Sequence, residues 1–285
     1  MTILHCFFVL TITNFIMLRC VFGFIVMNGE SYLVRNIRRI MAIASKHFQD
    51  SYCICFIEND STDKTRVILK HFMHTYPNLF IGEFLNFGDH KHSTELCDKD
   101  TDSYNCSKRT QRLAKLRNKV LDLVPECDYF VMLDMDFVIL PDPTALFHRL
   151  DSHPSTNAVF GISVIHKHTN HFYDLGAFAP KSLLMIYVFL LFFEWIPIHS
   201  CFSGFGAYRW SCVRNIRYNT KCKFIEHNDF NMQISGKYVT LSFNPEYDGV
   251  GKFYTSKTFY LFVSILLIVV LTCCIVCTVL ILSKS

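Results

Sequence analysis

The chain has 285 residues, of which 51% are hydrophobic and 18% are charged, and its mean hydropathy is +0.25. This balance is too apolar for an ordinary soluble enzyme and too charged for a protein that crosses the membrane many times. The net charge of +4 is small and the basic residues are not clustered, so no nucleic-acid-binding surface is expected.

An apolar segment, residues 1–19, opens the chain. Residues 2–18 are apolar, but they lack the basic start of a secretory signal, and Arg19 follows them. The pattern leaves three interpretations open: a signal peptide, an uncleaved membrane anchor, or a lead-in to the first strand.

Strands and helices alternate after this segment. Apolar runs predict strands at 21–27, 52–57 and 79–85. Apolar positions that recur at intervals of three and four predict helices at 32–47, 65–74 and 110–123. Such alternation is typical of βαβ units, so the predicted fold class is α/β, with a doubly wound and mainly parallel sheet in one domain, 20–250. Ligands of these sheets bind at the carboxyl ends of the strands.

The end of the second predicted strand carries a polar motif that begins at Glu58 and ends at Asp63. A hydroxyl from Ser61 or Thr62 can cap the following helix, and Asp63 suits the positive amino end of that helix. Capping does not account for Glu58 and Asn59. A carboxylate and an amide at the edge of a sheet are suited to ribose hydroxyls or a base edge, so we expect Glu58 and Asn59 to contact a nucleotide.

The apolar run at 129–138 is interrupted by Asp134 and Asp136. Side chains two residues apart in a strand project to the same face, so both carboxylates are expected to converge at the carboxyl end of this strand. Two oxygen donors there suit Mn²⁺ or Mg²⁺ and leave coordination positions for a phosphorylated substrate. An acidic turn without a metal would show the same pattern.

A later motif places two carboxylates and an imidazole in one short stretch, at Glu226, His227 and Asp229. One carboxylate is a candidate general base toward an acceptor hydroxyl, or a group that holds the acceptor. His227 is interpreted either as a metal ligand or as a hydrogen-bonded structural histidine.

Residues 258–282 contain no charged side chain and are long enough to cross a hydrocarbon core about 30 Å thick. They predict a single-pass transmembrane helix, with the endomembrane system as the location and the side of the membrane left open. The apolar run at 183–193 is too short to span a bilayer. It is either a buried element or a segment that rests on the membrane beside a lipid-linked acceptor.

Taken together, the motifs resemble a known family. Four motifs of this chain follow one another in the order seen in the nucleotide-sugar half of a GT-A glycosyltransferase, which they resemble. They are Asn28 after the first strand, residues 57–65, Arg117-Asn118 and residues 133–136. Downstream, the chain resembles the fungal capsule-associated α-1,3-mannosyltransferase family at 173–177, 202–209, 226–231 and 244–245. The similarity covers roughly residues 21–245.

The resemblance implies a metal-dependent transferase that moves a sugar, mannose from GDP-mannose, onto a hydroxyl of a glycan or a lipid-linked acceptor. It implies nucleotide contacts from Asn28, Glu58, Asn59, Asp60, Arg117 and Asp134. It implies binding of Mn²⁺ or Mg²⁺ by Asp136, Asp134 and His227, and catalytic roles for Glu226 and Asp229. A UDP-sugar donor and a catalytically degenerate nucleotide-sugar-binding protein are the alternatives. The family usually has Gly-Gly where this chain has Ser203-Gly204, which leaves acceptor and sugar specificity open.

Overall fold

The computed structural model describes residues 18–87, 108–165, 168–172, 179–180, 195–221, 226–240, 243 and 245–247. The predicted transmembrane helix at 258–282, the apolar run at 183–193 and residues 1–17 of the amino-terminal segment lie outside these ranges. Within the described ranges, no helix has both the length and the apolar character needed to cross a membrane.

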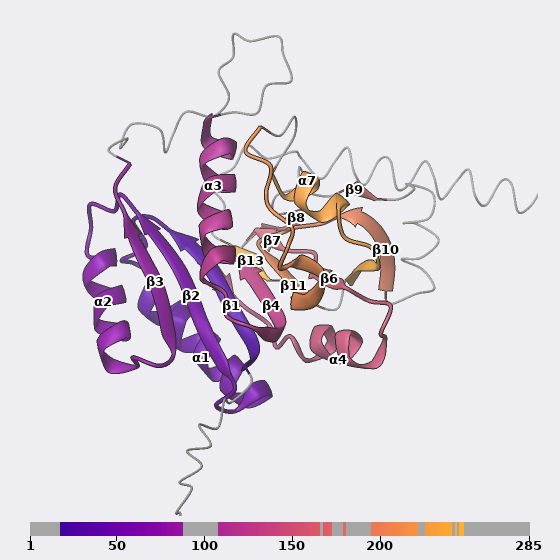
Figure 1. Ribbon diagram of the computed structural model, residues 1–285, viewed down its shortest axis with the longest axis horizontal. Coiled ribbons are helices and arrows are strands. Elements are labelled where there is room, and N and C mark those ends of the chain that lie inside the picture. The colour runs from indigo at the N-terminus through magenta and orange to yellow at the C-terminus, as the bar shows by residue number, and fades with distance from the viewer. Residues whose placement is uncertain are drawn as a thin grey trace, which may run out of the picture.

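A nine-stranded sheet forms the centre of the molecule (Figure 1). Its order begins with β3 (Phe80–Leu85), β2 (Tyr52–Asn59), β1 (Leu18–Val26) and β4 (Cys127–Leu133). It continues with β11 (Phe205–Arg209), β6 (Ala158–Gly161), β12 (Lys237–Thr240), β10 (Trp195–Ser200) and β9 (Ala179–Pro180). A second sheet joins β5 (Phe137–Ile139), β13 (Glu246–Tyr247), β7 (Val164–Ile165) and β8 (His168–Phe172).

The sheet is mixed rather than mainly parallel. Strands β3, β2, β1 and β4 are parallel, as the βαβ pattern predicts, whereas β11 runs antiparallel to both β4 and β6. Among the described strands of this sheet, four neighbouring pairs are parallel and four are antiparallel. The reversal begins where Phe205 of β11 pairs with Leu133 at the carboxyl end of β4, and β11 runs back along β4 from there.

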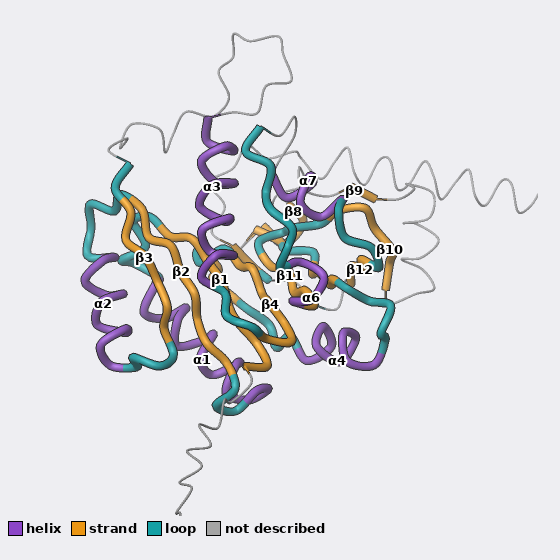
Figure 2. The backbone as a smooth tube through the Cα atoms, in the orientation of Figure 1, coloured by secondary structure: helices purple, strands orange, loops and turns teal. Residues whose placement is uncertain are grey.

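Helices cover both faces of the large sheet. One face packs against α1 (Leu33–Phe48), α2 (Thr65–Thr75) and α4 (Thr144–Ser152). The other packs against α3 (Lys108–Leu123), α6 (Trp210–Val213) and α7 (Glu226–Met232). Figures 1 and 2 show α3 in front of the parallel strands and α1 behind them. The helices and strands predicted in the first half of the chain are therefore confirmed to within a few residues.

Alternation along β1 divides its side chains between the two faces. Phe22 and Phe24 pack with the residues of α1, while Val21 packs with those of α3. Gly23 points toward α3, and a Cβ atom there would lie 2.7 Å from side-chain atoms of Phe130 and Val120. This glycine therefore lets α3 lie close to the sheet.

Candidate functional site

The candidate site lies where β4 ends. β4 stops at Leu133 and β5 begins at Phe137, so Asp134 and Asp136 belong to the turn between two strands and not, as predicted, to one continuous strand. The Asp134 N–H donates to the Gly204 carbonyl, 2.8 Å away, in the loop before β11, which extends the pairing of β4 with β11 by one position. Gly204 has a φ of 80°, a conformation that glycine adopts without steric cost. Both carboxylates are half-buried at the carboxyl edge of the parallel strands.

Asn36 of α1 fixes this turn. Its Nδ2 donates to the carbonyl oxygens of Met135 at 2.6 Å and Phe137 at 2.7 Å, which stand on either side of Asp136. Arg35 also donates to the Phe137 carbonyl, at 3.0 Å. Asn36 is only 1% exposed. The sequence motifs do not single out Asn36, although a polar residue on the buried face of an apolar helix is a signal that could have identified it.

Arg117 of α3 brings together two of the predicted site carboxylates. Its Nη1 forms an ion pair with Glu226, and its Nη2 lies 3.2 Å from Asp134 Oδ1. The guanidinium also lies over the rings of Phe202, at 5.4 Å, and Tyr218, at 6.0 Å. Arg117 is 5% exposed, so its charge is stabilised by these carboxylates and rings rather than by water. We call Arg117, Asp134 and Glu226 the Arg117 cluster.

His227 lies beside this cluster in an aromatic pocket. Its ring stacks on Phe202 with 3.5 Å between centroids, and its Nδ1 is 3.4 Å from the Tyr218 hydroxyl. Burial, and after it the charge of Arg117, holds the pKa of His227 well below its usual range, so the imidazole is neutral. Its Nε2 lies 4.0 Å from a Glu226 oxygen and makes no hydrogen bond within the described residues.

The predicted ligand set of Asp134, Asp136 and His227 is not assembled in this structure. Within the described residues, no group of three or more histidine, cysteine, aspartate or glutamate side chains is arranged to hold a metal ion. The reason is that His227 is enclosed by the aromatic pocket, whereas the two aspartates lie on the turn after β4. The aspartate pair is what a cation could use.

The two predicted catalytic carboxylates occupy different environments, although both lie in the first turn of α7. Glu226 is 3% exposed and pairs with Arg117. Asp229 is half-buried and accepts a hydrogen bond from Asn219 Nδ2 at 3.2 Å. Of the two, Glu226 is therefore the one in contact with the Arg117 cluster.

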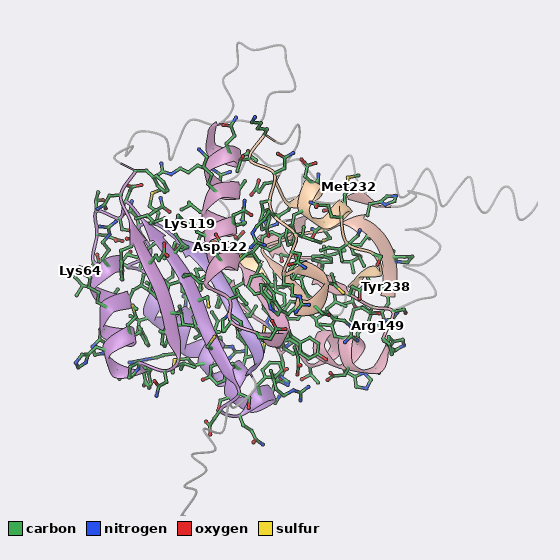
Figure 3. All side chains as sticks on the ribbon, in the orientation of Figure 1. Lys64, Lys119, Asp122, Arg149, Met232 and Tyr238 are labelled. Atoms are coloured by element: carbon green, nitrogen blue, oxygen red, sulfur yellow. The ribbon has the colours of Figure 1, made fainter. Side chains whose placement is uncertain are left out.

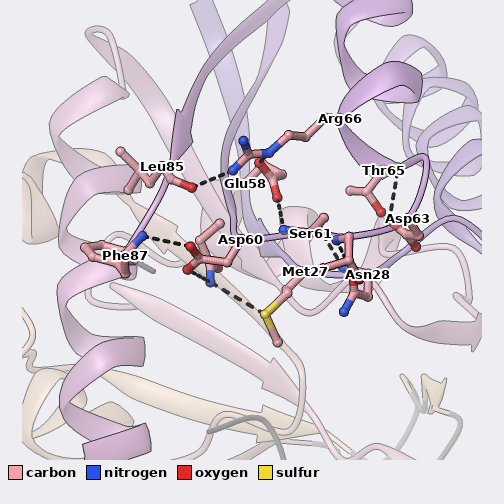
Figure 4. Close-up of polar contacts among 12 residues, drawn as sticks. Met27, Asn28, Glu58, Asp60, Ser61, Asp63, Thr65, Arg66, Leu85 and Phe87 are labelled. Atoms are coloured by element: carbon pink, nitrogen blue, oxygen red, sulfur yellow. Dashed lines mark hydrogen bonds and ion pairs between the residues drawn. The ribbon is translucent and has the colours of Figure 1, made fainter. Parts of the chain in front are cut away.

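Two strand-end turns are bound to each other beside the site (Figure 4). The Asn28 N–H donates to Ser61 Oγ at 2.9 Å, and Asn28 Oδ1 accepts from the Thr62 N–H at 2.8 Å. The Gly29 N–H donates to Thr65 Oγ1 at 2.7 Å. We call residues 28–30 and 58–66 the clasp. Asn28, predicted as a nucleotide contact, here joins the end of β1 to the end of β2.

Other predicted nucleotide contacts are also paired inside the protein. Glu58 is fully buried, accepts from the Ser61 N–H at 2.8 Å and forms an ion pair with Arg66 (Figure 4). Asp60 forms an ion pair with Arg112 and accepts from the Phe87 N–H at 2.8 Å. Asn59 Nδ2 lies 3.4 Å from Asp60 Oδ2.

The capping expectation is also revised. Lys64 is the residue that precedes α2, and it makes no side-chain capping hydrogen bond. Asp63 Oδ1 accepts from the Thr65 N–H at 2.9 Å, while the Ser61 hydroxyl is taken by Asn28. Ser61 therefore stabilises the clasp rather than the helix.

Comparison with known proteins identifies the fold. No protein-family model matches the sequence, and no curated protein matches it. Among solved structures, residues 1–349 of S. aureus TarS in complex with UDP align with a TM-score of 0.54 and 14% identity, over 80% of this chain and 60% of that chain. GalNAc-T7 with UDP, GalNAc and Mn²⁺ aligns with a TM-score of 0.52 and 10% identity, over 81% and 43%. The mixed α/β fold of this chain is that of GT-A glycosyltransferases.

Proposed function

We propose that this chain is a GT-A glycosyltransferase that moves a sugar from a nucleotide sugar to a hydroxyl of a glycan or a lipid-linked acceptor. One observation carries the proposal: Asp134 and Asp136 stand at the carboxyl edge of the parallel strands, and Asp134 is joined through Arg117 to the buried Glu226. In open α/β sheets this edge is where ligands bind. The matched part of the chain spans 60% of the TarS fragment, so the activity is inferred from the site and not from the alignment.

The aspartate pair fits Mn²⁺ or Mg²⁺, since both cations prefer carboxylate oxygens and retain positions for phosphate oxygens. Asn36 holds the carbonyls on both sides of Asp136, so its carboxylate is presented from a fixed turn. We assign Asp136 as the ligand and Asp134 as its support. The cation, when bound, would neutralise charge on the diphosphate leaving group. The GalNAc-T7 structure was determined with Mn²⁺.

Glu226 is proposed as the carboxylate on the acceptor side. Its carboxylate pairs with Arg117, and a carboxylate can accept a proton from an acceptor hydroxyl or hold that hydroxyl in place. The first role belongs to an inverting transferase and the second to a retaining one. Arg117 is proposed to orient Glu226 and, on its other side, Asp134.

We propose GDP-mannose as the donor, because the sequence resembles the α-1,3-mannosyltransferase family. A UDP-sugar is the second candidate, because the TarS and GalNAc-T7 structures that share this fold contain UDP. The test is a donor-hydrolysis screen over GDP-mannose and the common UDP-sugars with Mn²⁺, using Asp136→Asn as the control. Hydrolysis of one donor by the wild type alone supports a transferase. Nucleotide binding without hydrolysis of any donor would instead support the degenerate binding protein.

Membrane attachment through residues 258–282 is part of the proposal, with the endomembrane system as the location. The support is the uncharged length of this segment, which suffices to cross a bilayer. Ending the chain after Lys257 is expected to move the protein from carbonate-washed membranes to the soluble fraction. Continued pelleting would identify the amino-terminal segment as an anchor.

A further inference from the structure

Tyr32 stands at the point where the clasp meets the turn of the aspartate pair. It is the residue before α1, and its N–H donates to the Gly29 carbonyl at 3.1 Å. Its ring packs on the same glycine, because a Cβ atom at Gly29 would lie 3.1 Å from Tyr32 Cε2. The half-buried ring is therefore held in place by the backbone of the clasp.

The direction of the side chain follows from its neighbour one turn along α1. Tyr32 and Asn36 are four residues apart and share a helix face. Asn36 binds the carbonyls on both sides of Asp136, so this face of α1 lies against the aspartate turn. The charges that act on the Tyr32 hydroxyl agree with this placement, since they come from Asp136, Asp134 and Asp63.

The hydroxyl is a hydrogen-bond donor. Burial, together with those three carboxylates, raises the pKa of Tyr32, so the phenol keeps its proton at neutral pH. Among the described residues, the hydroxyl has no hydrogen-bond partner, the three aspartates included. An O–H that faces the aspartate turn and has no acceptor in the described part of the chain is suited to a ligand oxygen that arrives with its own cation.

We propose that Tyr32 Oη donates a hydrogen bond to an oxygen of the donor diphosphate, next to the cation held at Asp136. This inference rests on the proposed function and adds to it a residue that binds the leaving group. A nucleoside diphosphate is the ligand class, because a cation held by Asp136 and the diphosphate together would bring phosphate oxygens to the turn against which the Tyr32 and Asn36 face of α1 lies.

The test is the Tyr32→Phe variant, which removes one oxygen and keeps the ring on Gly29. Calorimetry with Mn²⁺ measures the Kd of UDP, GDP, UMP and GMP for the full chain. Loss of one hydrogen bond to a charged group is expected to raise the Kd of the bound diphosphate about tenfold. The monophosphate Kd should change by less than about twofold. Tyr76→Phe, a change at the end of α2 in a side chain that is 42% exposed, is the matched control.

Three results would overturn the inference. Unchanged diphosphate affinity in Tyr32→Phe, with an unchanged Tm, removes Tyr32 from the site while the proposed function stands. Equal weakening of the diphosphate and the monophosphate shows that the hydroxyl does not bind the diphosphate selectively. Failure of the wild type to bind either diphosphate with Mn²⁺ overturns the proposed function, and the role of Tyr32 falls with it.

Discussion

Two groups of carboxylates at the carboxyl edge of the parallel strands are neutralised in different ways. In the clasp the two buried carboxylates each have an arginine, Glu58 with Arg66 and Asp60 with Arg112. In the Arg117 cluster one guanidinium is divided between Asp134 and Glu226, which come from different elements of the fold.

This difference separates carboxylates that stabilise the fold from carboxylates that act on the substrate. A buried carboxylate with its own arginine and a backbone donor is paired within the protein, so we expect the clasp to act on stability. Counted together with Asp136, the Arg117 cluster carries formally one positive and three negative charges, and a divalent cation at the aspartate pair would balance them. We therefore expect changes near the cluster to act on turnover.

The largest effect is expected for Asp136→Asn. If Asp136 binds the cation, this change removes several kcal/mol of charge stabilisation, and Mn²⁺-dependent turnover of the sugar nucleotide should fall about a thousandfold. The Tm should be nearly unchanged. Asp122→Asn is the control, since this exposed aspartate lies on α3 (Figure 3). Full activity in Asp136→Asn, with metal still required, would remove Asp136 as the ligand.

Glu226→Gln should have the next largest effect. Loss of a catalytic carboxylate is expected to slow transfer about a hundredfold, whereas the amide still fills the space beside Arg117. Nucleotide affinity, measured by calorimetry, should stay nearly the same because Glu226 acts on the acceptor. Asp229→Asn serves as the comparison: Asp229 lies three residues after Glu226 in the chain but pairs with Asn219, so this variant should retain most activity. A large loss of nucleotide affinity in Glu226→Gln would assign this segment to structure or metal binding.

Arg66→Ala tests whether the clasp acts on stability. It leaves Glu58 buried without its arginine, so the free energy of unfolding in urea should fall by about 3 kcal/mol. Lys119→Ala breaks the exposed pair with Glu83 and should cost less than about 1 kcal/mol (Figure 3). Turnover by the folded fraction of Arg66→Ala should change little. A raised donor KM with normal stability would return Glu58 to the nucleotide site.

The fold was predictable where the signal is local. Apolar periodicity located the helices and strands of the parallel half, because each of those elements buries one face or both. The break after Leu133 and the reversal of β11 were not predictable in this way. Both involve contacts between distant parts of the chain: Asn36 of α1 holds the carbonyls of the turn after β4, and β11 pairs with β4 from Phe205 and Leu133 onward.

The residues of the candidate site also fall into those that the sequence could predict and those that it could not. Motif order drew attention to Arg117, Asp134 and Glu226, and the structure brings these residues together. The partners of the clasp carboxylates were not foreseen, because a motif shows which residue is acidic and does not show which arginine will reach it. Asn36 and Tyr32 were missed for a related reason: their importance lies in a turn almost a hundred residues away.

The smallest effect is expected for Asn28→Gly. Asn28 has a φ of 52°, which glycine adopts readily, so this variant removes only the hydrogen bonds that Asn28 Oδ1 accepts from the N–H and the hydroxyl of Thr62. The free energy of unfolding should fall by about 1 kcal/mol. Asn28→Ala should lose about 1 kcal/mol more, because a Cβ without a polar side chain disfavours the left-handed backbone.

The donor KM decides whether the comparison holds at Asn28. If this residue only joins the two turns, both variants should keep the wild-type donor KM while they differ in stability. A donor KM raised about tenfold in Asn28→Gly, with nearly normal stability, would show that Asn28 contacts the donor directly. The clasp would then bind the donor as well as stabilise the fold, and at the end of β1 one residue would act on both stability and turnover.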